Sequence, residues 1–221
     1  MRDPHLPDTA AALRPRLDAG LDALQLPLPD TARTALLGYL VQMHKWNAAY
    51  NLSAVRELPL MLSRHLLDSL SVAHLITGGR IVDVGTGADL PGLPLAIAQP
   101  HRHFTLVDSA GKRIRFLQHV VRVLNLTNVT VIQSRVQDLP AVAADQIVSR
   151  AFTSLVAFAE LCEPHLQASG QLLAMKGIPP LDEIDALAGV WQATVHTLQV
   201  PELDARRCAV VLSRTDPGAP N

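Results

Sequence analysis

The sequence contains little cysteine, few aromatic residues and no long hydrophobic run. Its two cysteines, Cys162 and Cys208, form no close-spaced pair, so we expect neither a zinc site nor a redox couple, and we predict no metal site. No apolar stretch approaches the roughly 20 residues that a membrane-spanning helix needs. The opening residues, MRDPHLPDTA, lack the apolar core of a secretory signal. We therefore expect a cytoplasmic protein with no membrane partner.

The charges nearly cancel, with 19 Lys and Arg against 20 Asp and Glu and a formal net charge of −1. Such a balance neither indicates nor excludes nucleic-acid binding, because a local basic face can bind phosphates on a neutral protein. A chain of 221 residues with 48% hydrophobic content is long enough for one well-buried domain with a small appendage.

The first third of the sequence has the spacing of helices. Leucines recur every three or four residues over 13–24, and similar spacing predicts helices over 30–46 and 58–75. Asp30 or Thr31 would cap the second of these helices. We therefore expect residues 1–75 to form an N-terminal helical extension packed on the main domain.

Short β-branched runs follow residue 79 and alternate with helical segments over 94–98, 112–124, 155–166 and 181–187. This alternation predicts a mostly parallel sheet covered on both faces. The final two runs are joined by PELDARR, which is too short for a crossover helix, so they should form an antiparallel hairpin. The seven predicted strands read RIVDV, HFTLVD, NVTVIQ, DQIVS, GQLLAMK, ATVHTLQV and RRCAVVLS. We expect an α/β domain over 76–214 and a disordered tail over 215–221.

The segment VDVGTGADLPG has the features of a cofactor loop. The first predicted strand ends at Val84, and ligands of open parallel sheets bind beyond the carboxyl ends of the strands. Gly85 and Gly87 would let the backbone approach a ligand closely. Asp108 ends the second predicted strand, where its carboxylate could accept hydrogen bonds from ribose hydroxyls. Together these features indicate an adenosine-containing cofactor.

The identity of that cofactor depends on the residues around the glycines. A dinucleotide fingerprint requires G-x-G-x-x-G, but Leu90 stands at the third glycine position. Asp83, two residues before the first glycine, is more typical of S-adenosylmethionine enzymes, whose ligand has an ammonium and a sulfonium instead of a pyrophosphate. A nicotinamide-dependent oxidoreductase and a purely structural turn are the alternatives. A P-loop is excluded because no Gly-Lys-Ser/Thr follows.

An ordered series of motifs from about His44 to Lys176 resembles the bacterial 16S ribosomal RNA guanine-N7 methyltransferases of the glucose-inhibited division protein B family. The motifs are HKWNAAYNLSAVR, RHLLDSL, VDVGTGADLPGLPLAI, FTLVDSAGKRIRFL, SRVQDL, VSRAF and AMKG. The resemblance implies a class I, Rossmann-like methyltransferase fold with a helical extension and S-adenosyl-L-methionine as cofactor. It also implies 16S ribosomal RNA, or the small ribosomal subunit, as partner and guanine 527 in standard 16S numbering as acceptor. We expect a monomer.

The same resemblance implies which residues meet the cofactor. It puts Gly85 and Leu90 at the cofactor, Asp108 near the ribose, and Val136 and Gln137 at the adenine. The full predicted cofactor set is Asp83, Gly85, Gly87, Leu90, Asp108, Val136, Gln137 and Arg150.

Two positions depart from the pattern that the resemblance leads us to expect. Gln137 stands where we expect glutamate, which matters only if the side chain makes the contact. Asp89 stands where we expect glycine. Aspartate tolerates a left-handed backbone well, so we expect cofactor binding to persist. The alternative is a non-catalytic RNA-binding relative that is impaired at Asp89.

Methylation of guanine N7 needs no general base, because N7 carries a lone pair in the neutral base. Catalysis can then come from positioning in a site that excludes water. We assign no certain catalytic residue, and we expect Arg150 and Phe152 to position the guanine, Phe152 by stacking. For Trp46 and Tyr50 we favour core packing over base stacking.

The predicted RNA contacts are Asn51, Arg64, Lys112, Arg113, Arg115 and Lys176, of which Asn51 and Lys176 are implied by the resemblance alone. Three of them open a predicted helix, which is the wrong end for the helix dipole. RNA phosphate, the cofactor carboxylate or a solvated face could each account for their position. His65 and Asp68 can share a helix face, either as a salt bridge or as a substrate contact.

Overall fold

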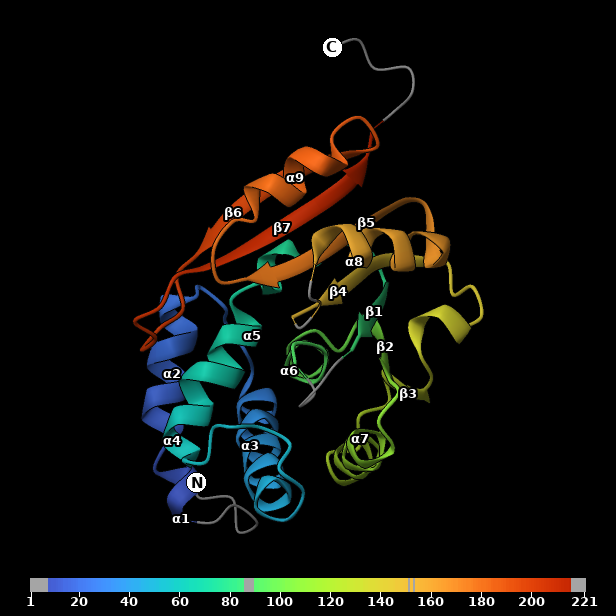
Figure 1. Cartoon of the computed structure of the whole chain (residues 1–221). Coiled ribbons are helices and arrows are strands. Elements are labelled where there is room, and N and C mark those ends of the chain that lie inside the picture. Colours follow the sequence, from blue (N-terminus) through green and yellow to red (C-terminus); the bar gives the residue numbers. More distant parts are fainter. Residues whose placement is uncertain (1–7, 86–89, 151, 153, 216–221) are drawn as a thin grey trace.

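The computed structural model describes residues 8–85, 90–150, 152 and 154–215, which fold around one seven-stranded sheet (Figure 1). The strand order is β3-β2-β1-β4-β5-β7-β6, and β7 runs antiparallel to both of its neighbours while the other pairs are parallel. The predicted fold, a mostly parallel sheet with a C-terminal antiparallel hairpin, is confirmed. The strands are β1 (Arg80–Val84), β2 (His103–Asp108), β3 (Val129–Gln133), β4 (Ala144–Ser149), β5 (Leu166–Lys176), β6 (Trp191–Leu198) and β7 (Arg207–Arg214).

Helices precede the sheet, but the third predicted helix is not continuous. A π-helical turn, η1, interrupts it and separates two short α-helices. The elements before β1 are α1 (Asp8–Ala11), α2 (Arg14–Ala23), α3 (Asp30–Tyr50), α4 (Leu58–Met61), η1 (Leu62–Leu67), α5 (Asp68–Leu70) and the 3₁₀ turn η2 (Ala73–Leu75). The predicted cap of α3 is wrong: Pro29 is the N-cap, and the Asp30 carboxylate accepts a hydrogen bond from Arg14 on α2 instead (2.5 Å).

The remaining helices lie between the strands, two on each face of the sheet. They are α6 (Gly92–Ala98), α7 (Gly111–Val123), α8 (Leu155–Cys162) and α9 (Leu181–Leu187), with 3₁₀ turns η3 (Val136–Asp138) and η4 (Glu163–His165). The helix predicted over 155–166 ends early, because Pro164 lies in η4 and β5 begins at Leu166.

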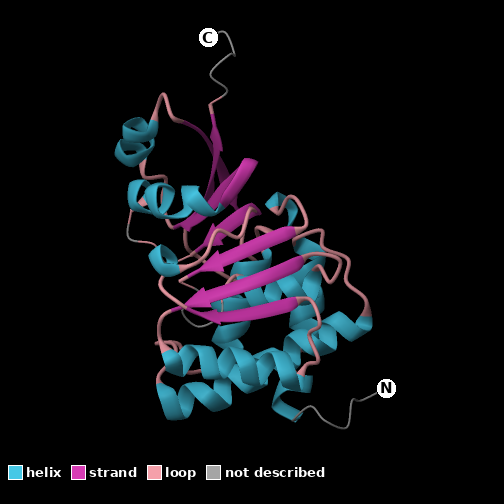
Figure 2. Ribbon diagram, turned by 90° about the vertical axis from the view of Figure 1, so that its right-hand side faces the viewer, coloured by secondary structure: helices cyan, strands magenta, loops and turns pink. Residues whose placement is uncertain are grey.

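The N-terminal helices, α6 and α7 cover one face of the sheet, and α8 and α9 cover the other (Figures 1 and 2). Successive strand residues point to opposite faces, so Ile81 joins the core under the N-terminal helices and Val82 joins the core under α8. Leu36 of α3 and Phe104 of β2 belong to the same buried cluster. The helical extension therefore packs directly on the sheet. No helix in the described ranges is long and apolar enough to span a membrane.

The strand order of the sheet reverses between β1 and β4, which is the topological switch point. The strands β2 and β3 lie on one side of this point, and β5, β7 and β6 lie on the other. Because β1 to β5 are parallel, the residues that follow them emerge at one edge of the sheet. Ligands of open α/β sheets bind at this place.

Candidate active site

A pocket of about 410 Å³ opens beyond the carboxyl ends of β1, β2 and β3. Gly85, which follows β1, lines it with a positive φ of 64°, a conformation that favours glycine. A Cβ at Gly85 would meet no other atom within 4 Å, so the space beside this backbone is open. The Gly85 N–H donates to the carbonyl of Val107 at 2.9 Å and fixes the loop start against β2.

Asp108 ends β2 at the rim of the same pocket and is 4% exposed. Its Oδ1 accepts the Ala110 N–H at 2.8 Å, and its Oδ2 pairs with Arg113 at 3.1 Å. These contacts hold the carboxylate in a fixed orientation at the pocket. They also explain why α7 tolerates Arg113 in its first turn, because the cation has an acidic partner there.

Asp83 lies one layer below the pocket and is fully buried. Its Oδ2 accepts the Gly92 N–H at 2.7 Å, whereas its Oδ1 has no hydrogen-bond partner among the described residues. A Cβ at Gly92 would lie 2.6 Å from that Oδ2, so this contact requires glycine. Burial raises the pKa of Asp83 to about 8, against the opposing effect of the Gly92 N–H. Asp83 is therefore mainly protonated at pH 7.

The third side of the pocket is formed by η3 and the chain that precedes it. Val136 and Gln137, which were predicted at the adenine, line the pocket, and Ser134 and Arg135 line it as well. Phe152 also faces this pocket and packs on Phe158 of α8, with ring centroids 5.2 Å apart. The structure thus places Phe152 beside the predicted cofactor residues; its role toward a guanine stays a prediction.

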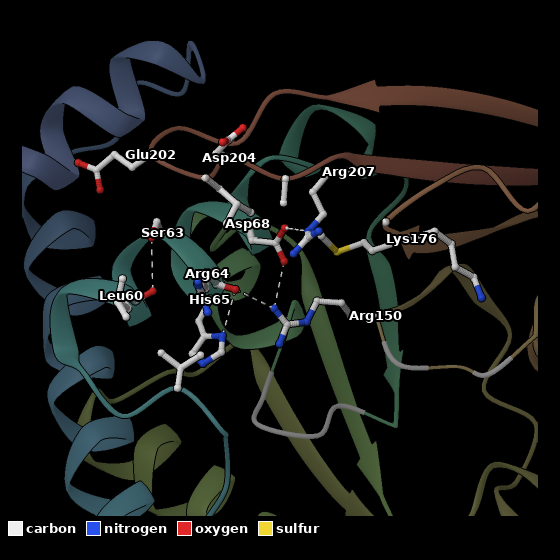
Figure 3. Close-up of a pocket in the computed structure, with 15 residues that line it drawn as sticks. Leu60, Ser63, Arg64, His65, Asp68, Arg150, Lys176, Glu202, Asp204 and Arg207 are labelled. Atoms are coloured by element: carbon white, nitrogen blue, oxygen red, sulfur yellow. Dashed lines mark hydrogen bonds and ion pairs between the residues drawn. The ribbon is translucent and has the colours of Figure 1, made fainter.

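A second pocket, of about 660 Å³, opens at the ends of β4 and β5 (Figure 3). Its charged lining is mixed, with four cationic side chains (Arg64, Arg150, Lys176 and Arg207) and three acidic ones (Asp68, Glu202 and Asp204). Arg150 was predicted at the cofactor, but its side chain lines this second pocket. The Nζ of Lys176 donates to the Phe152 carbonyl at 3.1 Å, which connects the two pockets.

Asp68 organises the cations of the second pocket. It is 2% exposed, and its two oxygens pair with Arg150 at 3.0 Å and with Arg207 at 2.9 Å (Figure 3). Arg150 also donates to the Arg64 carbonyl at 3.2 Å. One carboxylate from the N-terminal extension thus positions one arginine after β4 and one arginine at the start of β7.

His65 does not pair with Asp68, so of the two alternatives for these residues the salt bridge is wrong. The Asp68 carboxylate pairs with Arg150 and Arg207 instead. The His65 Nδ1 donates to the Arg64 carbonyl at 3.0 Å, so the Nε2 accepts from the Ser53 hydroxyl at 2.8 Å. Burial, followed by the charge of Arg150, lowers the pKa of His65 to about 4. His65 is neutral at pH 7.

Other predicted residues lie around these pockets without lining the first one. Leu90 is buried in the apolar core, and Asn51 caps α3 with a positive φ of 50° and accepts a hydrogen bond from Arg56. Lys112 and Arg115 are exposed on α7. Gly87 and Asp89 lie outside the described residues.

The sequence analysis did not identify Arg207, and therefore missed the ion-pair centre that Asp68 forms with Arg150 and Arg207. Arg207 is far from Asp68 in the chain, and a lone arginine at the start of a strand has no local motif. Ser134 and Arg135 could have been found, because they stand at the end of β3, where the neighbouring strands carry their pocket residues.

The cysteines are placed in the core, as expected for structural thiols. Cys162 is fully buried in α8, where burial raises the pKa of its thiol to about 12. Burial also raises the pKa of Cys208 in β7. Neither thiol has the thiolate character that a nucleophile needs.

The fold is that of S-adenosylmethionine-dependent methyltransferases of known structure. The chain is similar to a crystal structure of such a methyltransferase from Aquifex aeolicus, with a TM-score of 0.53 and 18% identity over 71% of this chain and 94% of that one. It is also similar to a ribosomal protein L11 methylase from Lactobacillus delbrueckii, with a TM-score of 0.54 and 17% identity over 68% and 77% of the two chains.

Sequence comparison identifies the family. The model of the GidB family, rRNA small subunit methyltransferase G, matches residues 32–211. The ribosomal RNA small subunit methyltransferase G of Vibrio vulnificus is 47% identical over 93% of this chain and 99% of that protein. The protein of the same name from Serratia proteamaculans is 48% identical over 90% and 98%. The chain belongs to the rRNA small subunit methyltransferase G family.

Proposed function

We propose that the chain transfers a methyl group from S-adenosyl-L-methionine to N7 of a guanine in 16S ribosomal RNA, guanine 527 in standard 16S numbering. It acts as a monomer in the cytoplasm, on the RNA or on the small ribosomal subunit. The observation that carries this proposal is the pair of pockets at the carboxyl ends of the parallel strands. One has the open glycine backbone and the Asp108 carboxylate, the other has arginine and lysine donors, and the Lys176–Phe152 hydrogen bond links them. Family membership supports it.

The first pocket fits S-adenosylmethionine. Its volume of about 410 Å³ falls in the range of small-ligand sites. The open space beside Gly85 admits a ligand close to the backbone, and Asp108 presents carboxylate oxygens to ribose hydroxyls. Val136 and Gln137 would flank the adenine. Asp83 and Leu90 would support the loop from below, and Gly87 would complete it.

The second pocket fits the acceptor. Arg64, Arg150, Lys176 and Arg207 offer hydrogen-bond donors for RNA phosphate and for the O6 and N7 acceptor edge of guanine. Asp68, Glu202 and Asp204 share the lining, and Asp68 orients two of these donors. Arginine and lysine are donors only, so they favour guanine O6 over the amino group of adenine at the same place. Asn51 would add a contact at the end of α3.

Positioning supplies the catalysis in this account. S-adenosylmethionine provides an electrophilic methyl group when bound. The N7 lone pair of neutral guanine needs no deprotonation, so no general base is required. Both ring nitrogens of His65 already have hydrogen-bond partners in Ser53 and Arg64. Arg150, held by Asp68, and Phe152, held by Phe158, would orient the base between the two pockets and exclude water.

The rival functions make different predictions. A nicotinamide-dependent oxidoreductase would bind NAD, and an RNA-binding relative impaired at Asp89 would bind neither cofactor. We expect S-adenosylhomocysteine to bind in the micromolar range and NAD to show no affinity. The reverse result would replace the methyltransferase by the oxidoreductase.

A deletion strain tests the proposed activity in the cell. Mass spectrometry of its 16S RNA should show loss of one N7-methylguanine, which returns when the gene is restored. An unchanged pattern of guanine methylation would refute the proposal.

A further inference from the structure

A shallow hollow lies between α3 and α7, apart from the two pockets of the candidate active site. It has a volume of about 420 Å³ and is lined by Trp46, Arg115, Gln118, His119 and Arg122. None of these residues lines either active-site pocket. The hollow is therefore a separate feature of the surface.

Three rings lie side by side at this hollow. Trp46 stacks on Tyr50 with centroids 5.0 Å apart and contacts the His119 ring at 5.2 Å. Tyr50 is 42% exposed, which is unusual for a tyrosine that serves only packing. His119 donates from Nε2 to Gln42 at 3.0 Å, and burial followed by the charge of Arg122 lowers its pKa. The result is an uncharged aromatic platform open to solvent on one side.

The two chain segments that carry the platform contain basic but no acidic residues. The sequence has no Asp or Glu between Asp30 and Glu57, or between Asp108 and Asp138, although the net charge of the whole chain is −1. Lys112, Arg115 and Arg122 are exposed on α7, and none of them pairs with a carboxylate in the described part of the chain. Unpaired cations beside exposed rings are the chemistry that binds single-stranded nucleic acid.

The helix α7 carries residues of both the hollow and the candidate active site. That helix begins next to Asp108, and the Nζ of Lys112 donates to the Tyr50 carbonyl at 3.4 Å. From Lys112 to Arg122 the helix advances about 15 Å, which is long enough for more than one phosphate group. A strand that enters the active site can thus continue along α7.

We propose that the α3–α7 seam (Trp46, Tyr50, Lys112, Arg115, His119 and Arg122) is a second RNA-binding surface, which stacks an unpaired base next to Tyr50 and holds the adjacent phosphates on the three cations. The proposal rests on the proposed function, because the bound RNA is the strand that flanks the acceptor guanine. It assigns a role to Arg122 and Tyr50, which no active-site pocket uses.

Binding to deproteinised 16S RNA as a function of salt tests the charges. The double variant Arg115→Gln/Arg122→Gln should lower the slope of log K against log[salt] by about 0.7 for each cation removed. The matched control is Arg80→Gln. Arg80 begins β1, at the end of the strand away from the pockets, where it is 55% exposed and pairs with Asp145. This variant should leave the slope unchanged. S-adenosylhomocysteine affinity should stay the same in both variants.

The ring is tested by a pair of substitutions at Tyr50. Tyr50→Ala should weaken RNA binding by about tenfold, and Tyr50→Phe should restore it because the stacking face is retained. In methylation assays Tyr50→Ala should raise KM for RNA and leave kcat nearly unchanged.

Each contrary result has its own meaning. Unaltered RNA affinity and salt slope in the variants, with active wild-type protein, would overturn the seam and leave the proposed function intact. The seam variants could also bind small ribosomal subunits more weakly than wild type and yet bind deproteinised RNA normally. That result would also overturn the proposal and indicate a ribosomal protein as partner. Wild-type protein that binds RNA through the seam but methylates none would contradict only the proposed function.

Discussion

At the scale of single residues, two carboxylates at the ends of neighbouring strands have opposite environments. Asp83 is buried with one oxygen unpaired among the described residues, whereas Asp108 reaches the pocket rim and pairs with Arg113. The first is neutral at pH 7 and supports the loop through Gly92. The second is held in position for a ligand. Each environment leads to a measurable consequence.

Asp83 should make the protein less stable as the pH rises. Its pKa is about 8 in the folded chain and about 3.9 in an unfolded one, so folding takes up a proton between these values. Its contribution to the free energy of unfolding is therefore fully present below about pH 4 and declines, by on the order of 1 kcal/mol per pH unit, up to about pH 8. Asp83→Asn cannot ionise and keeps an acceptor for Gly92.

Urea unfolding at pH 5 and pH 8 checks this prediction. The stability of Asp83→Asn relative to wild type should rise between the two pH values. An equal difference at both would show that Asp83 is ionised in the folded protein.

Asp108 should control cofactor affinity. Asp108→Asn keeps the size of the side chain but loses the charged acceptor and the pairing with Arg113, so S-adenosylhomocysteine affinity should fall about tenfold or more. Calorimetry measures the affinity, with Asp138→Asn, an exposed acid of η3, as the control. Wild-type affinity in Asp108→Asn would remove the ribose role.

At the scale of elements, the ion-pair centre at Asp68 links three parts of the fold: η1 with α5, the chain after β4, and the start of β7. The two arginines are 25% and 30% exposed, so water partly solvates them. Asp68 itself is buried, and its loss would leave both cations without their shared partner. The centre therefore positions Arg150 as well as stabilising the fold.

Asp68→Asn should lower the free energy of unfolding by about 1–3 kcal/mol, because an uncompensated charge is left next to the core. It should also lower kcat, since Arg150 loses its orientation. Glu163→Gln is the matched control, because it breaks the exposed pair with Arg214 and should cost less than about 1 kcal/mol. Equal costs for the two variants would contradict a special role for Asp68.

The elements were largely predictable because their signals are local. The β-branched runs and the helix over 181–187 follow from alternation and periodicity, and the structure reproduces them. The interruption of the third helix at η1 was not predictable, since nothing in Leu62–Leu67 breaks an α-helix by composition. The residue that follows this turn, Asp68, pairs with Arg150 and Arg207, which are distant in the sequence.

At the scale of the whole molecule, the sheet edge brings two pockets together from segments that are far apart in the sequence. The glycine loop and Asp108 could be predicted as one site, because strand ends meet at one edge of a parallel sheet. The division into two pockets could not be predicted, because it depends on the direction in which the Arg150 side chain points. Asp68 pairs with both Arg150 and Arg207, and these ion pairs exist only in the folded chain.

A reconstituted reaction tests methyl transfer to guanine N7. Purified protein is incubated with methyl-labelled S-adenosylmethionine and with 16S RNA or small ribosomal subunits from a strain that lacks the modification. We expect one labelled methyl group on N7 of a single guanine, located by mass spectrometry of RNA fragments. Label on another atom or base, or no transfer by protein that binds the cofactor, would contradict it.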